Sequence, residues 1–149
     1  MKQAVRAIAA AEQAYFLTEG KYAANFNELD VDLGSLTPVQ TSPGGAGECN
    51  TTVVGTDSIR QHKDYYVALN FSDSKLSSGA VVAYWRQGKY KCAGFGMSLN
   101  KKPSAVHCRE MKTTGTRYYS AGKDNFCKKV EHSKGTLPEG DSWRKYKLP

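Results

Sequence analysis

Cysteine and histidine are the residues of this chain that could carry metal or thiol chemistry. Its 149 residues include four cysteines, Cys49, Cys92, Cys108 and Cys127. No two of them form a C-x-x-C pair, and the three histidines are scattered, which argues against a zinc site. An even number of widely separated cysteines suits disulfide bonds in an oxidising compartment. Of the three possible pairings we favour Cys92 with Cys108 and Cys49 with Cys127; the alternative is a cytosolic protein with four buried thiols.

Catalytic motifs are missing from the sequence. It contains no G-x-S-x-G or H-E-x-x-H pattern, no glycine-rich phosphate loop and no carboxylates spaced so as to meet. His107 and Cys108 are adjacent, but neighbouring side chains rarely point together, and we expect Cys108 to form a disulfide. Asp30 and Asp32 are expected to cap a turn before Gly34. We therefore predict no catalytic residue, no metal ligand, no cofactor and no enzyme activity, with a hydrolase as a third possibility.

Positive charge is concentrated in the second part of the chain. Residues 1–85 carry 6 basic and 9 acidic side chains, a net charge of −3, whereas residues 86–149 carry 15 basic and 5 acidic ones, a net charge of +10. Such a charge attracts polyanions, and interleaved aromatic rings would suit stacking on bases. The competing interpretation is a set of solvated loops, or pairing with the acidic part of another subunit. The candidate polyanion surface comprises Lys101, Lys102, Arg109, Lys112, Arg117, Lys123, Lys128 and Lys129.

The first element that the sequence predicts is a helix at residues 2–19. This segment has no Gly or Pro, holds six alanines and repeats apolar residues at three- and four-residue steps. Gly20 tolerates the left-handed backbone of a helix end. No capping residue precedes Lys2, so we expect the natural helix to run further upstream. The residues expected to pack this helix on a sheet are Val5, Ile8, Tyr15 and Phe16.

A β-meander is expected to lie under the helix. Alternating and β-branched runs predict three antiparallel strands, at residues 64–71, 79–86 and 89–95. Gln87-Gly88 would join the last two as a two-residue hairpin turn. A sheet with one apolar face needs a cover, and the helix carries the only long apolar stripe. Further on, Pro103 and the residues up to Met111 predict a short helix.

The start of the chain resembles a known family. Gln13-Ala-Tyr-Phe16, followed by Gly20-Lys-Tyr22 and Phe26-Asn-Glu-Leu29, is similar to the second half of the long N-terminal helix of type IV pilins and type II secretion pseudopilins. The resemblance is close over residues 1–33 and covers the rest in outline. The family's leader peptide and hydrophobic half-helix would precede Lys2. The alternative is an ordinary amphipathic helix in an unrelated small α+β domain.

This resemblance implies a single pilin-like domain, 1–149, of the α+β class. A long N-terminal amphipathic helix packs on an antiparallel β-meander, and an irregular C-terminal region is bounded by a disulfide. The expected divisions are the truncated helix with its exit turn (1–33), a loop region (34–62), the β-meander (63–97) and a C-terminal variable region (98–149).

The resemblance also implies a function in assembly. The chain would be a structural subunit of a type IV pilus or type II secretion pseudopilus that presents its C-terminal region outward. Its partners would be other pilin subunits, meeting the polar helix face of Lys2, Arg6 and Glu19, and the inner membrane through a segment upstream of Lys2. It would reside in an extracellular filament or the periplasm. The alternative is a secreted basic module that binds DNA or another polyanion, which includes a minor pilin for DNA uptake.

Overall fold

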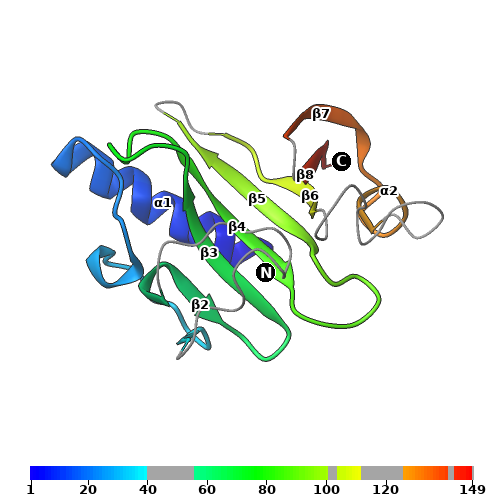
Figure 1. Ribbon diagram of the computed structural model, residues 1–149, viewed down its shortest axis with the longest axis horizontal. Helices are drawn as coiled ribbons and strands as arrows, with labels where there is room; N and C mark the ends of the chain where they lie inside the picture. The colour runs from blue at the N-terminus through cyan, green and yellow to red at the C-terminus, as the bar shows by residue number, and fades with distance from the viewer. Residues whose placement is uncertain (40–55, 101–103, 112–125, 141–142, 149) are drawn as a thin grey trace.

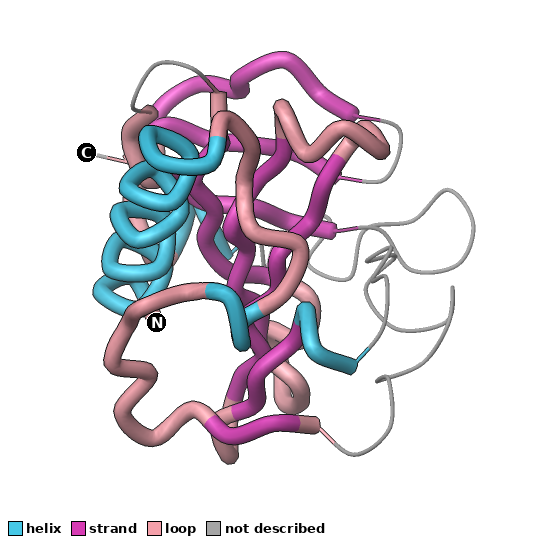
Figure 2. The backbone as a smooth tube through the Cα atoms, turned by 90° about the vertical axis from the view of Figure 1, so that its left-hand side faces the viewer, coloured by secondary structure: helices cyan, strands magenta, loops and turns pink. Residues whose placement is uncertain are grey.

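A long helix lies against one face of an antiparallel β-sheet (Figures 1 and 2). The structure, a computed structural model, describes residues 1–39, 56–100, 104–111, 126–140 and 143–148. The α+β class and the packing of a helix on an antiparallel sheet, both predicted from the sequence, are confirmed in this part of the chain.

The helix α1 spans Lys2–Glu19, the range that its composition predicts. It ends because Gly20 adopts a left-handed backbone with φ 72°, which lets its N–H donate to the Phe16 carbonyl at 2.9 Å. In addition, 3₁₀ turns form at η1 (Phe26–Glu28) and η2 (Thr56–Ser58).

Three of the four expected packing residues hold α1 on the sheet. Val5 and Ile8 are buried in the core between helix and sheet, and the half-buried Phe16 packs against it. Tyr15 does not belong to this cluster, contrary to the prediction. The reason is helical geometry: the buried stripe continues from Glu12 to Phe16, and each residue turns the helix by about 100°, which rotates Tyr15 away.

The centre of the sheet is formed by β3 (Tyr65–Phe71), β4 (Gly79–Trp85) and β5 (Ala93–Leu99). The first two strands match the predicted ones and pair in one continuous register. The third begins later than expected, and the predicted two-residue turn is wrong. Gly88 has φ 82°, and successive turns follow in which Lys91 N–H bonds the Gly88 carbonyl and Ala93 N–H bonds the Tyr90 carbonyl, so the connection spans residues 86–92.

Further strands extend both edges of this centre. On one side, β1 (Thr37–Pro38) and β2 (Ile59–Gln61) form within the expected loop region. On the other side lie β6 (His107–Met111), β8 (Trp143–Lys147) and β7 (Lys134–Gly140), with a short helix α2 (Phe126–Lys129). The order of the eight-stranded sheet is β1-β2-β3-β4-β5-β6-β8-β7.

The C-terminal region is therefore not irregular where the structure describes it. The predicted short helix up to Met111 is wrong, because residues 107–111 pair with β5 on one side and β8 on the other. The backbone hydrogen bonds offered by those neighbours, which are distant in sequence, outweigh a local helix signal.

Side chains alternate between two apolar clusters on the two faces of the sheet. Val67, Val81 and Phe95 belong to the core under α1, whereas Val82 and Tyr84 belong to a second cluster on the opposite face. This division decides which side chains can meet.

The disulfide pairing differs from the predicted one. Cys108 is bonded to Cys127 in α2, with their Cα atoms 5.7 Å apart, so neither Cys92–Cys108 nor Cys49–Cys127 forms. Cys108 and Cys127 both lie in the core under α1, while Cys92 belongs to the cluster on the opposite face, so the sheet separates Cys92 from Cys108. Cys92 is itself disulfide-bonded, and Cys49 lies outside the described residues.

Candidate functional site

The outer face of α1 carries an uncharged stripe of small and apolar residues. Ala7, Ala10, Ala14 and Leu17 are all exposed, and Leu17 is 86% exposed. Their spacing of three, four and three residues is the one that forms a seam between packed helices. A helix face that meets only water normally carries charged and polar residues instead. We call these four residues the outer stripe.

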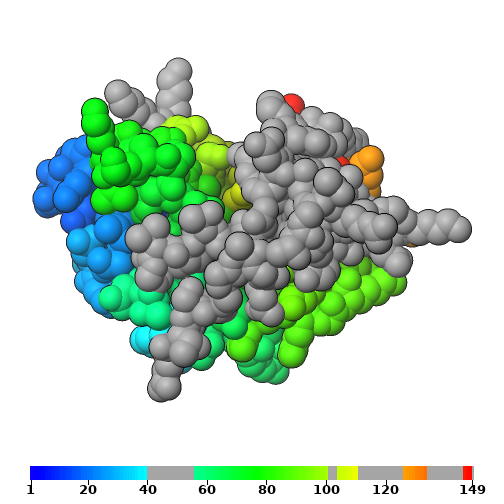
Figure 3. Space-filling model, viewed as in Figure 1, coloured from blue at the N-terminus to red at the C-terminus, as the bar shows by residue number. Residues whose placement is uncertain are grey.

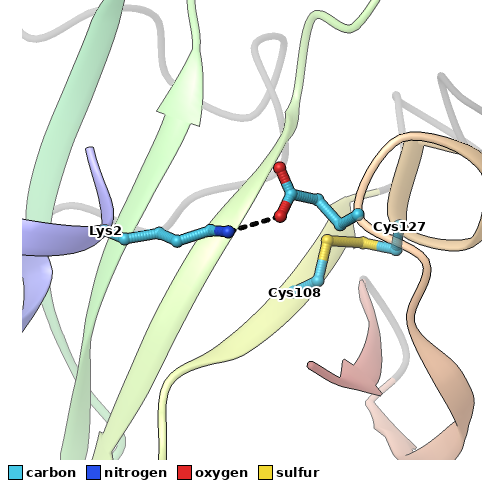
Figure 4. Close-up of polar contacts among 4 residues, drawn as sticks. Lys2, Cys108 and Cys127 are labelled. Carbon is cyan, nitrogen blue, oxygen red and sulfur yellow. Dashed lines mark hydrogen bonds and ion pairs between the residues drawn. A yellow bond between two sulfur atoms is a disulfide. The ribbon is translucent and has the colours of Figure 1, made fainter. Parts of the chain in front are cut away.

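The charged residues of α1 do not interrupt the outer stripe. Arg6 borders it and Glu19 lies in the last turn, and both are exposed. Lys2, the third residue of the predicted polar face, forms an ion pair with Glu131 of the same chain (Figure 4). Its ammonium also lies 4.8 Å from the centre of the Phe95 ring. The N-terminal end of the helix is thereby fixed to the C-terminal region.

The Cys108–Cys127 disulfide lies close to this ion pair (Figure 4). It ties α2 to β6, and the buried Glu110 of the same strand accepts hydrogen bonds from Cys127 N–H at 3.2 Å and from the Tyr146 hydroxyl at 3.4 Å. These contacts support the segment that carries Glu131.

Glu12 anchors the other half of the helix from its buried side. Its side chain is fully buried, and Oε2 accepts a hydrogen bond from Ala23 N–H at 2.9 Å. Oε1 is buried and has no hydrogen-bond partner among the described residues. Burial raises the pKa of Glu12 to about 7; the charge of Glu28 adds to this rise and the Ala23 N–H opposes it.

A polar network continues this anchor to the sheet. The Tyr22 hydroxyl donates to the Asn100 carbonyl at 3.0 Å, and Gln13 Nε2 donates to the Tyr22 hydroxyl at 3.2 Å. With both halves held, α1 presents the outer stripe on a fixed support.

The candidate polyanion surface is only partly described. Arg109 is 4% exposed in β6, and desolvation lowers its pKa to about 10, so its inclusion in a surface was wrong. The reason is topological, because β6 is an interior strand between β5 and β8. Lys128 and Lys129 of α2 are exposed, with Lys128 lying 5.8 Å from the centre of the Tyr146 ring. The members outside the described residues are Lys101, Lys102, Lys112, Arg117 and Lys123.

The residues considered for catalysis or metal binding do not gather into a site. Cys108 is in a disulfide and faces the core under α1. Asp32 accepts a hydrogen bond from Gly34 N–H at 2.9 Å, as expected for a turn cap. Within the described ranges, no three His, Cys, Asp or Glu side chains are grouped as a metal site would require.

The outer stripe is the feature that sequence reasoning missed. The three- and four-residue spacing of the alanines carries its signal, but the sequence prediction treats the face opposite the core stripe as polar. Among the described residues no helix has the length and apolar character needed to cross a bilayer. Comparisons with protein-family models, curated proteins and solved structures find no match.

Proposed function

We propose that this chain is a structural subunit of a filament of the type IV pilus or type II secretion pseudopilus class. The observation that carries the proposal is the outer stripe of α1. The inner face of the helix is buried on the sheet, and its outer face carries the exposed outer stripe, bordered by Arg6, so α1 has small and apolar residues on two sides. A helix of this kind is normally covered on both sides.

In the proposed assembly, α1 packs against the helices of neighbouring subunits. The small side chains of Ala7, Ala10 and Ala14 let two helix backbones approach closely, as small residues do between packed helices. Leu17 would insert between residues of the facing helix. The sheet and the C-terminal strands would then form the outer wall of an extracellular filament or of a periplasmic pseudopilus.

A first test is the coding sequence upstream of Lys2. The proposal requires an apolar helical segment of about 20 residues there, long enough to anchor the subunit in the inner membrane before assembly. A cleaved secretory leader directly before this chain would contradict the proposal.

A second test places a charge in the outer stripe. Ala10→Glu and Ala14→Glu should abolish filaments in cells that carry the whole gene, because a carboxylate would be buried between helices. Electron microscopy of sheared filaments measures the loss, and circular dichroism of the purified chain should show unchanged folding.

Ala105→Glu is the matched control for this test. It makes the same change at an exposed alanine outside the helix, and it should leave filament yield unchanged. Filaments that form normally with both helix variants would refute the assembly proposal.

A further inference from the structure

An acidic groove lies between the η2 turn and the loop that joins β3 to β4. It has a volume of about 680 Å³. Phe71 and Leu76 give it an apolar wall, and Asp57 and Asp73 bring two carboxylates to its lining. Such a groove suits a lysine side chain, whose stem is apolar and whose end is a cation.

The two carboxylates of this groove differ in their exposure and hydrogen bonding. Asp57 is exposed. Asp73 accepts hydrogen bonds from the Ser77 N–H and hydroxyl, both at 3.2 Å, and the former is the main reason that the pKa of Asp73 is lowered, so it stays ionised. The nearby Arg60 guanidinium is buried, donates to Asn27 at 2.8 Å and lies 5.0 Å from the centre of the Phe26 ring.

A basic tip with complementary chemistry lies at the end of α2. It consists of Lys128, Lys129 and Val130, all of which are exposed, and Val130 is 42% exposed. Val130 and Leu17 are the large hydrophobic residues that stand out as exposed in the described part of the chain. Lys128 lies 5.8 Å from the centre of the Tyr146 ring of its own chain, so the tip offers the Lys129 cation next to the exposed Val130. This pair matches the carboxylates and the apolar wall of the groove.

We propose that the acidic groove of one copy of this chain binds the basic tip of a second copy. The ammonium of Lys129 would pair with Asp57, while its stem and Val130 contact Phe71 and Leu76. The proposal deepens the filament function above and rests on it, because it names a contact between subunits besides the helix packing.

The positions of groove and tip determine what such a contact builds. The loop between β3 and β4 lies at the left end of the long axis and α2 at the right end (Figures 1 and 3). The basic tip of one copy therefore cannot enter the groove of the same copy. Two copies joined by one contact keep one groove and one tip available for further copies. Contacts of this head-to-tail kind produce open polymers rather than closed dimers.

Zero-length carbodiimide cross-linking tests the contact directly. We mix ¹⁵N-labelled and unlabelled chains at high concentration and low salt, and map the linked peptides by mass spectrometry. The expected product joins Lys129 or Lys128 of one isotope form to Asp57 or Asp73 of the other. The absence of this intermolecular link, or its presence only within single chains, would overturn the proposal.

Charge reversal tests whether the pairing contributes to association. Asp57→Lys and Lys129→Glu should each weaken self-association by about fivefold in sedimentation equilibrium, since a partly exposed ion pair is replaced by like charges. A chain that carries both changes should associate as the wild type does. Asp30→Lys and Lys147→Glu make the same changes at exposed residues outside the groove and the tip, and should have no effect.

Two outcomes separate this proposal from the filament proposal. If the Ala10→Glu change prevents assembly while Asp57→Lys and Lys129→Glu do not, the filament stands and the groove contact is wrong. If both reversals weaken association but their combination does not restore it, the two residues do not face each other and the contact is again wrong.

Discussion

At the scale of single residues, Glu12 is a carboxyl group whose charged form is disfavoured by burial. One oxygen of its carboxyl group accepts a hydrogen bond from a backbone N–H. The other oxygen is buried and has no hydrogen-bond partner among the described residues. Burial raises its pKa from 4.5 to about 7. Between these two values the unfolded chain loses the Glu12 proton while the folded chain keeps it, so the free energy of unfolding falls as the pH rises from about 4.5 to about 7.

We expect Glu12→Gln to remove this pH dependence. The neutral amide mimics the protonated acid, so the variant should match the wild type near pH 4.5 and be more stable at pH 8 by up to about 3 kcal/mol. Urea unfolding at pH 5 and pH 8 measures the difference.

Glu19→Gln is the control, because it changes an exposed glutamate of the same helix. It should leave the difference between the two pH values as it is in the wild type. If Glu12→Gln also leaves that difference unchanged, Glu12 titrates as an exposed residue, and the buried position of its carboxyl group is wrong.

At the scale of elements, the Cys108–Cys127 disulfide joins β6 to α2 over a separation of 19 residues. A cross-link over such a loop restricts the unfolded chain and stabilises the fold by about 3 kcal/mol. Replacing both cysteines with alanine should lower the free energy of unfolding by about that amount in urea titrations.

Peptide mapping without reduction checks the pairing itself. We expect the peptide with Cys108 to be linked to the peptide with Cys127. A link between Cys108 and Cys92 would show that the two faces of the sheet are assigned wrongly.

At the scale of the whole molecule, charge is divided between the two parts of the sequence. Exposed cations of the described part include Lys128, Lys129 and Lys147 near the C-terminal end, while Arg109 of the basic half is buried. Under the proposed filament function, we expect such charges to serve contacts between subunits rather than tight polyanion binding.

Heparin chromatography tests this expectation. The chain should elute below the physiological ionic strength of about 0.15 M, and the double change Lys128→Gln, Lys129→Gln should elute earlier, since fewer cations release fewer counterions. Lys21→Gln with Lys75→Gln removes two exposed lysines elsewhere and should shift elution less. Retention of the wild type well above that ionic strength would favour the secreted polyanion-binding module.

Local periodicity and local turn chemistry are enough to predict several elements of the fold. The alanine-rich segment predicted α1 and its end at Gly20, and the alternating runs predicted β3 and β4. Asp32 could be assigned to its turn because its partner, Gly34, is two residues away. In each case the residues that decide the structure are neighbours in sequence.

Other features depend on partners that are distant in sequence, and local patterns do not predict them. Residues 107–111 form a strand because β5 and β8 supply its hydrogen bonds, and the same position in the sheet buries Arg109. Cys108 meets Cys127 rather than Cys92 because the sheet separates its two faces. A sequence period defines stripes on a helix but not which of them is buried. The outer stripe of α1 is therefore identified by the sheet that covers the opposite side of the helix.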